Sequence, residues 1–133
     1  MTNTIPPHST HKYYIYLSLL HLGAAMWSSS SKRLLLALQY TAEHSEVTDS
    51  PLKCLYAELA ASQKCSYPVI ERSLRYAINR IWTHNQAECA RLLYRSDAAL
   101  HKPTVSEFLC LYTDALARGS VQAWVDSIEA GIF

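Results

Sequence analysis

The sequence predicts an all-α protein, a compact bundle of six to seven helices that contains a helix-turn-helix. Apolar residues recur every three to four positions along most of the chain, which is the spacing of one helix face, and no segment shows strand alternation between turn signals. The 133 residues include only 3 Gly and 5 Pro, and half of them are hydrophobic. This composition is typical of one well-packed domain rather than a loop-rich or disordered chain.

The first helix is expected to begin at Thr10, after a flexible lead-in over residues 1–9 that contains Pro6 and Pro7. A single helical domain would then cover residues 10–133. The positions that recur at helical spacing in the first helix are Tyr13, Tyr14, Leu17, Leu20, His21 and Ala24.

Gly23 and the run Ser28–Ser31 separate this helix from a second one, which is expected over about residues 31–44. A third helix is expected to open at Ser50-Pro51, because Ser is a favoured N-cap and Pro suits the first helical position. It ends near Ser62.

The helix-turn-helix is expected over about residues 51–84. A turn at Gln63–Ser66 joins the third helix to a fourth over about Tyr67–His84, and Ser66 is the expected cap of the fourth. The turn lacks the Gly that is usual in such motifs.

The last third of the chain carries two further helix starts after a short fifth helix over about 86–94. Thr104 and Glu107 form a capping box, Gly119 ends that helix, and Ser120 can cap a final one that reaches about residue 130. The apolar stripe of the final helix predicts either a core helix or a dimer face: Val121, Trp124, Val125 and Ile128.

The charge is unevenly distributed, although the net charge is only +1. Residues 64–102 hold seven Lys and Arg against three acidic residues, whereas residues 103–133 hold one Arg against four acidic residues. A basic middle third is what attraction to phosphate requires, and a solvated helix face is the alternative interpretation.

The fourth helix has the two faces of a recognition helix. Its apolar residues fall on one side, whereas Arg72, Arg75, Tyr76 and Asn79 fall on the other, with Glu71 at the edge. An Arg fork can pair with guanine O6 and N7 together, and a Glu can accept from cytosine N4. The pattern therefore predicts base reading by this face.

The turn before the fourth helix is expected to hold the DNA backbone. Lys64 supplies a cation there, and Ser66 stands at the N-terminus of the helix, where backbone N–H groups attract phosphate.

Two segments of the chain resemble the C-terminal effector domain of the bacterial sporulation master regulator, stage zero sporulation protein A. The first is Pro51–Trp82, PLKCLYAELAASQKCSYPVIERSLRYAINRIW, and the second is Lys102–Phe108, KPTVSEF. His21-Leu22-Gly23 also stands where the family has a His-x-x-Gly start. The resemblance spans about residues 15–118.

The resemblance implies a six-helix DNA-binding domain that regulates transcription, reads its site with the fourth helix and binds tandem sites as a pair. It implies base contacts at Glu71 and Arg72, with Arg75 at a matching basic position. It also implies a contact between the RNA polymerase sigma subunit and the segment that contains Leu93 and Tyr94.

Several features depart from the family pattern. No receiver domain is expected within this chain, Val69 stands where the family usually has Arg, and Tyr76 stands where it has His. The C-terminal segment Ser120–Phe133 is additional. These departures leave the DNA site and its regulation undetermined by the resemblance.

Other chemistry has little support in the sequence. The four cysteines lack C-x-x-C spacing and are expected as reduced thiols, the scattered histidines predict no metal site or cofactor, and no nucleophile motif predicts an enzyme. No apolar run is long enough for a membrane span and no signal peptide is apparent, so a cytoplasmic protein is expected. Trp27, Trp82 and Trp124 are expected in the core or in an interface rather than stacked on bases.

Three functions remain open on this evidence. The first is sequence-specific binding of double-stranded DNA by a transcription regulator. The second is a protein-interaction module of the same fold that has lost DNA reading and binds a regulator or a sigma factor; the low net charge, Val69 and the acidic tail favour it. The third is a small-ligand sensor, supported only by the nine tyrosines.

Overall fold

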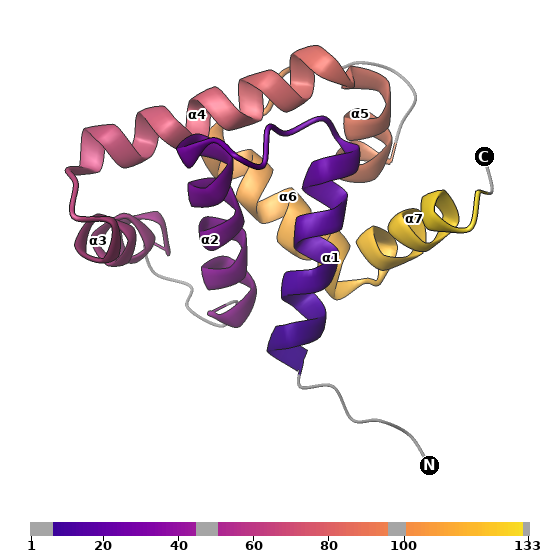
Figure 1. Ribbon diagram of the computed structural model, residues 1–133, viewed down its shortest axis with the longest axis horizontal. Coiled ribbons are helices and arrows are strands. Elements are labelled where there is room, and N and C mark those ends of the chain that lie inside the picture. The colour runs from indigo at the N-terminus through magenta and orange to yellow at the C-terminus, as the bar shows by residue number, and fades with distance from the viewer. Residues whose placement is uncertain (1–6, 45–50, 96–100, 132–133) are drawn as a thin grey trace.

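A computed structural model describes residues 7–44, 51–95 and 101–131, which form an all-helical bundle (Figure 1). The all-α class is confirmed, and the described residues form seven helices and no strand. The helices are α1 (Pro7–His21), α2 (Ser29–Glu43), α3 (Pro51–Gln63), α4 (Tyr67–His84), α5 (Gln86–Tyr94), α6 (Val105–Ala117) and α7 (Ser120–Glu129).

The helix ends follow local capping signals. α2 begins two residues earlier than expected, because Ser28 rather than a later serine is its N-cap and accepts a 3.1 Å hydrogen bond from the Ser31 N–H. α1 begins at Pro7 rather than Thr10, and the rest of the expected lead-in, residues 1–6, lies outside the described part, as does Ser50. The capping box of α6 is confirmed, whereas the N-cap of α7 is Gly119 and not Ser120.

α2 is the central helix of the bundle and packs against α1, α3, α4 and α6. A buried polar contact also joins distant helices in the core: the hydroxyl groups of Ser18 on α1 and Tyr112 on α6 share a hydrogen bond. Burial raises the pKa of Tyr112 well above its usual value, so its hydroxyl stays protonated and can donate to Ser18.

The inward face of α1 differs from the expected one. Ile15 and Leu19 are completely buried, as is Leu22 just after the helix, whereas Tyr13 and Leu20 are exposed. Apolar residues occur all round this helix, so their spacing alone cannot select the buried face. Packing against α2 and α7 selects it instead.

α7 is a core helix along at least one face. Val121 and Val125 are completely buried, and the Trp124 indole donates a 2.9 Å hydrogen bond to Glu88 on α5. The C-terminal stripe was expected as either a core helix or a dimer face, and these two valines belong to the core.

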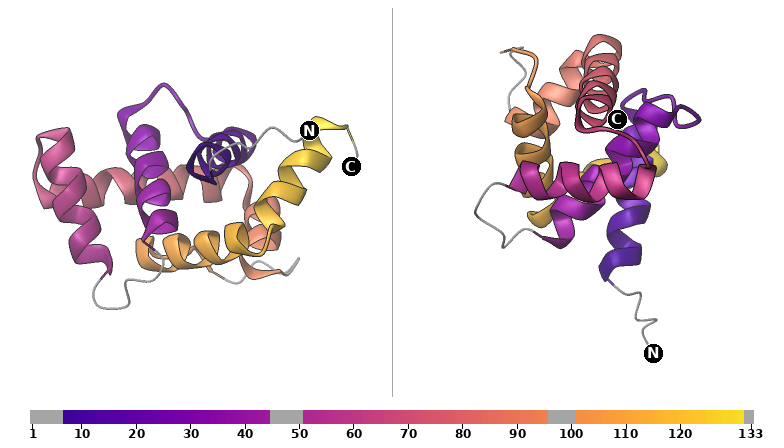
Figure 2. Two further views of the ribbon diagram at one scale, coloured as in Figure 1. Left: turned by 90° about the horizontal axis from the view of Figure 1, so that it is seen from below. Right: turned by 90° about the vertical axis from the view of Figure 1, so that its left-hand side faces the viewer.

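α4 lies across one side of the bundle, at the top of Figure 1, with the first turn of α2 against its inner side. Seen nearly end-on in the right-hand view of Figure 2, α4 has the α1–α2 connection on one side and the segment that leads into α6 on the other. Within the described ranges, no helix combines the length and hydropathy that crossing a membrane requires.

Candidate nucleic-acid interface

The turn between α3 and α4 has a helix-ending geometry that usually selects Gly. Lys64 adopts the left-handed conformation, with φ of 53°, and the Cys65 N–H donates a 3.1 Å hydrogen bond to the Ala60 carbonyl. This is the hydrogen bond of a Schellman motif, in which the left-handed residue is most often Gly. The turn therefore keeps the motif's geometry with a lysine, whose side chain is exposed.

Ser66 is the N-cap of α4, as expected, but it caps the helix by backbone position only. Its backbone is extended and its carbonyl accepts from the Ile70 N–H at 3.1 Å, while its side chain makes no capping hydrogen bond. The exposed Ser66 hydroxyl is therefore not committed to closing the first turn.

α4 buries one face and presents the other to solvent. Its buried residues are Ile70, Ser73, Leu74, Ala77, Ile78, Ile81 and Trp82. The expected reading residues Arg72, Arg75, Tyr76 and Asn79 are all exposed, and Tyr76 is 60% exposed. The structure thus brings these four side chains together on one accessible surface.

Glu71 and Arg75 form an ion pair one turn apart on α4. Both side chains are at least partly exposed, so water screens the pair and it contributes little to stability. No acidic side chain in the described ranges pairs with Arg72. Neither arginine is held by the acidic C-terminal helix.

The acidic groups of α7 pair elsewhere. The Tyr14 hydroxyl donates a 3.0 Å hydrogen bond to Asp126, and Glu129 lies 3.7 Å from the His21 ring. Both contacts join α7 to α1, so these carboxylates do not cover α4.

Sequence reasoning missed Lys102 as a member of this surface. Its ammonium group donates a 2.9 Å hydrogen bond to the Asn79 side chain, which places a further cation beside α4. An open hollow of about 430 Å³ lies between α4 and the segment that carries Lys102. It is lined by Tyr56, Glu71, Arg75, Ile78, Lys102, Pro103, Thr104, Val105 and Ser106. The sequence marks Lys102 as part of the basic third and of the KPTVSEF segment, but not its place beside Asn79, which lies 23 positions away.

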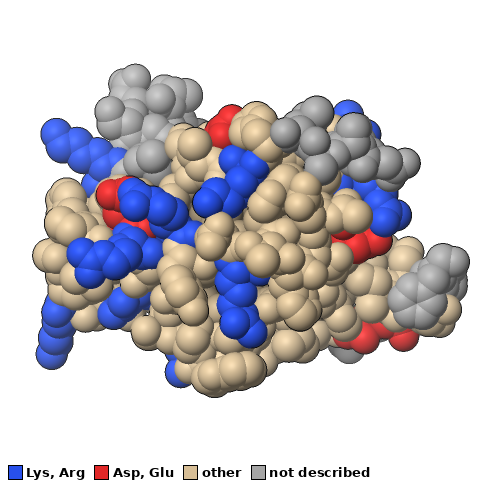
Figure 3. Space-filling view, turned by 90° about the horizontal axis from the view of Figure 1, so that it is seen from above, with Lys and Arg blue, Asp and Glu red and all other residues tan. Residues whose placement is uncertain are grey.

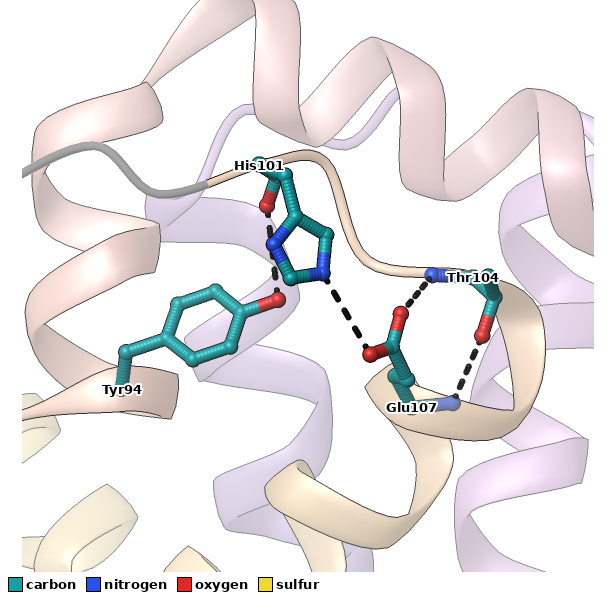
Figure 4. A network of polar contacts seen from close by, with 4 residues as sticks. All are labelled: Tyr94, His101, Thr104 and Glu107. Atoms are coloured by element: carbon teal, nitrogen blue, oxygen red, sulfur yellow. Dashed lines mark hydrogen bonds and ion pairs between the residues drawn. The ribbon is translucent and has the colours of Figure 1, made fainter.

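A polar network fixes the segment that carries Lys102 (Figure 4). Thr104 and Glu107 cap α6 reciprocally, with hydrogen bonds of 2.9 and 3.1 Å, and Glu107 also lies 3.3 Å from the His101 ring. The Thr104 N–H and the His101 ring hold the pKa of the Glu107 carboxyl below its usual value, so it stays charged near neutral pH. The Tyr94 hydroxyl donates to the His101 carbonyl at 3.4 Å, which ties α5 to the same segment.

Leu93 and Tyr94 have different surroundings. Leu93 is only 3% exposed and belongs to the core, so its side chain offers little surface to a partner, and the polymerase contact of this segment stays a prediction. Tyr94 is half-buried, and its ring lies edge-on against Trp82.

Basic side chains gather over the left and centre of the side that α4 forms, and few acidic ones are visible among them (Figure 3). Exposed Arg72, Arg75 and Arg80 all stand on α4 itself. The uneven charge of the sequence therefore becomes a spatial patch, although the net charge is small.

The described residues contain no group of three or more potential metal ligands. The four cysteines are free thiols, and burial raises the pKa of Cys89 to about 12, which keeps it protonated and unreactive.

A scan against protein families matches residues 16–116 to the family described as Sporulation initiation factor Spo0A C terminal. A search of curated proteins gives no match. The family match covers most of the chain and includes the whole of α2 to α5, and thus the α3–turn–α4 unit, whereas α7 lies beyond it. The chain therefore belongs to the Spo0A C-terminal family, the DNA-binding effector domains of sporulation regulators.

Proposed function

We propose that this protein binds double-stranded DNA sequence-specifically, by placing the outward face of α4 in the major groove, and thereby regulates transcription. The observation that carries the proposal is the exposure of Arg72 and Arg75 on a helix whose opposite face is anchored in the core. A helix presented in this way can enter the groove without unfolding any part of the bundle.

Base reading is assigned to the centre of this face. Arg72 and Arg75 have the planar fork that pairs with guanine, and Glu71 can accept from cytosine. Because Glu71 already pairs with Arg75, the two side chains meet the groove as a unit. Tyr76 and Asn79 extend the face along the helix and are assigned contacts with neighbouring bases or sugars.

Phosphate contacts are assigned to the edges of the face. Lys64 and Ser66 stand before the first turn of α4, and Lys102 stands beside Asn79. Such contacts set orientation and affinity without reading sequence.

Two further partners follow from the family. A second copy of the chain would occupy the adjacent site of a tandem pair, and the RNA polymerase sigma subunit would meet the surface near Tyr94. We expect a DNA-binding regulator of this kind to act in the cytoplasm.

The direct test is a selection of bound duplexes from a random pool, followed by titration of the best duplex against salt. The proposal expects an enriched sequence and an affinity that falls steeply as salt rises from about 50 to 200 mM, because phosphate contacts release counterions. Absence of duplex binding at about 50 mM salt contradicts it.

A protein-interaction module is the second candidate, and the Glu71–Arg75 pair favours it because the pair offsets the charge of one of the exposed arginines of α4. In that case the chain would retain a receiver-type regulator or a sigma factor in a pull-down with purified partners and retain no DNA.

A further inference from the structure

Trp27 is the most exposed large apolar side chain among the described residues, at 80% exposure. It stands in the α1–α2 connection next to Ala24 and Ala25, which are buried, and Met26, which packs against the core. The backbone around Trp27 is therefore anchored while the indole faces solvent. Of the two places expected for Trp27, this exposure excludes the core, and an interface remains a prediction.

Two contacts hold this connection against α4. Gly23 lies directly against the His84 ring, at the C-terminal end of α4, and leaves no room for a Cβ atom. Further along, the Arg33 guanidinium near the start of α2 donates a 2.8 Å hydrogen bond to Ser73, in the N-terminal half of α4. The chain from Gly23 to Arg33, with Trp27 between, is thus held beside the part of α4 between Ser73 and His84.

The α1–α2 connection, which carries Trp27, borders the opposite flank of α4 from the segment that carries Lys102. Ser73, Arg80 and His84 are spaced by seven and four residues, so they share one flank of the helix, and the α1–α2 connection borders it. Glu71 and Arg75 lie on the other flank, where they line the hollow with Lys102. The two bordering segments are visible on either side of α4 in Figure 2.

We propose that Trp27 contacts the sugar–phosphate backbone of one strand when α4 occupies the major groove. This inference rests on the proposed function. The groove is about 12 Å wide and a helix with its side chains measures about 10–12 Å across, so segments that flank the helix meet the strands at the groove edges. The indole N–H only donates, which suits a phosphate oxygen, and the ring offers apolar surface to deoxyribose. Exposed Lys32, in the first turn of α2, adds a cation to the same side.

The test measures quenching of tryptophan fluorescence by acrylamide in the full chain, with and without the best-binding duplex. Acrylamide is neutral, so the charge of the DNA does not exclude it. In the free protein Trp27 dominates the quenchable emission, because Trp82 is buried and Trp124 is half-buried. Duplex binding is expected to lower the slope of quenching against acrylamide concentration in the wild type to the slope of the free Trp27→Phe variant. This variant keeps an aromatic ring at position 27 but has no indole N–H.

A second reporter controls for indirect effects of DNA. The double variant Trp27→Phe with Tyr13→Trp moves the exposed indole towards the start of α1, well before the residues that meet α4. Its quenching slope is expected to stay unchanged when duplex binds. The Trp27→Phe variant should also bind duplex about tenfold more weakly, the equivalent of one hydrogen bond to a charged group.

Two outcomes overturn the inference. If anisotropy shows saturating duplex binding while Trp27 remains fully quenchable, Trp27 lies away from the DNA and the proposed function still stands. If protection of Trp27 follows protein concentration in the absence of DNA, its partner is a second copy of the chain. Failure to bind any duplex removes the proposed function first, and anisotropy alone reveals it.

Discussion

Lys102 and Asn79 are joined by a 2.9 Å hydrogen bond across 23 positions of sequence. The hydrogen bond holds the ammonium group of Lys102, which belongs to the segment before α6, at the outward face of α4. It makes that face a composite surface, in which α4 supplies arginines and a segment outside the helix-turn-helix supplies a lysine.

Substitution of Lys102 with Ala should weaken duplex binding about equally for all sequences. A phosphate contact contributes charge but no base discrimination, so the slope of log affinity against log salt should fall by about 1. Titrations at several salt concentrations with matched and scrambled duplexes measure both quantities. A change in the preferred sequence would show instead that Lys102 reads bases.

Substitution of Lys64 with Gly should stabilise the fold by up to about 1 kcal/mol. A left-handed backbone costs a residue with a Cβ atom about 1–2 kcal/mol, and part of that gain is offset by the greater freedom of Gly in the unfolded chain. Urea denaturation measures the change, and Ala57→Gly on the exposed side of α3 is the control, with an expected loss of about 0.5–1 kcal/mol. Equal losses in both variants would refute the assignment of Lys64 to a strained turn.

Substitution of Gly23 with Ala should destabilise the fold more than substitution of Gly119. Both glycines have positive φ, 98° and 80°, but only Gly23 lies against another side chain, the His84 ring. The backbone term is expected at about 1–3 kcal/mol in each variant, with a further steric loss for Gly23. Thermal unfolding measures both.

His84→Ala supplies the matching control, because removal of the ring should recover part of the stability lost in Gly23→Ala. No recovery in the double variant would mean that the ring is not what excludes a Cβ atom at Gly23.

The buried hydroxyls of Ser18 and Tyr112 should behave as a coupled pair. Ser18→Ala leaves the Tyr112 hydroxyl without its acceptor and should destabilise the fold by about 1–3 kcal/mol. Tyr112→Phe should be milder, because Ser18 keeps its 2.9 Å hydrogen bond to the Ile15 carbonyl. In a double-mutant cycle the combined loss should be smaller than the sum of the single losses. Strict additivity would show that the contact contributes nothing.

Local signals in the sequence were sufficient for much of the fold. α4 and α5 have their predicted bounds, and the capping box of Thr104 and Glu107 places the start of α6. These features depend on residues only a few positions apart, which is why periodicity and cap chemistry detect them.

Features that depend on tertiary contact could not be predicted in the same way. Apolar residues lie all round α1, so its sequence does not show which face is buried; packing against α2 and α7 determines that face. The Trp27 side chain is exposed, although large aromatic side chains are usually buried. The exposed reading face of α4 was predictable from its helical wheel, whereas the position of Lys102 beside it required the fold of the α5–α6 connection.

The most direct test of base reading by α4 compares wild type, Arg72→Ala and Lys12→Ala on matched and mismatched duplexes. Lys12 is an exposed cation on α1 and controls for loss of charge. The account predicts that Arg72→Ala reduces discrimination against one mismatched base pair by about 1–3 kcal/mol and retains much of the non-specific affinity, while Lys12→Ala keeps the wild-type preference. Wild-type discrimination that survives in Arg72→Ala would contradict it.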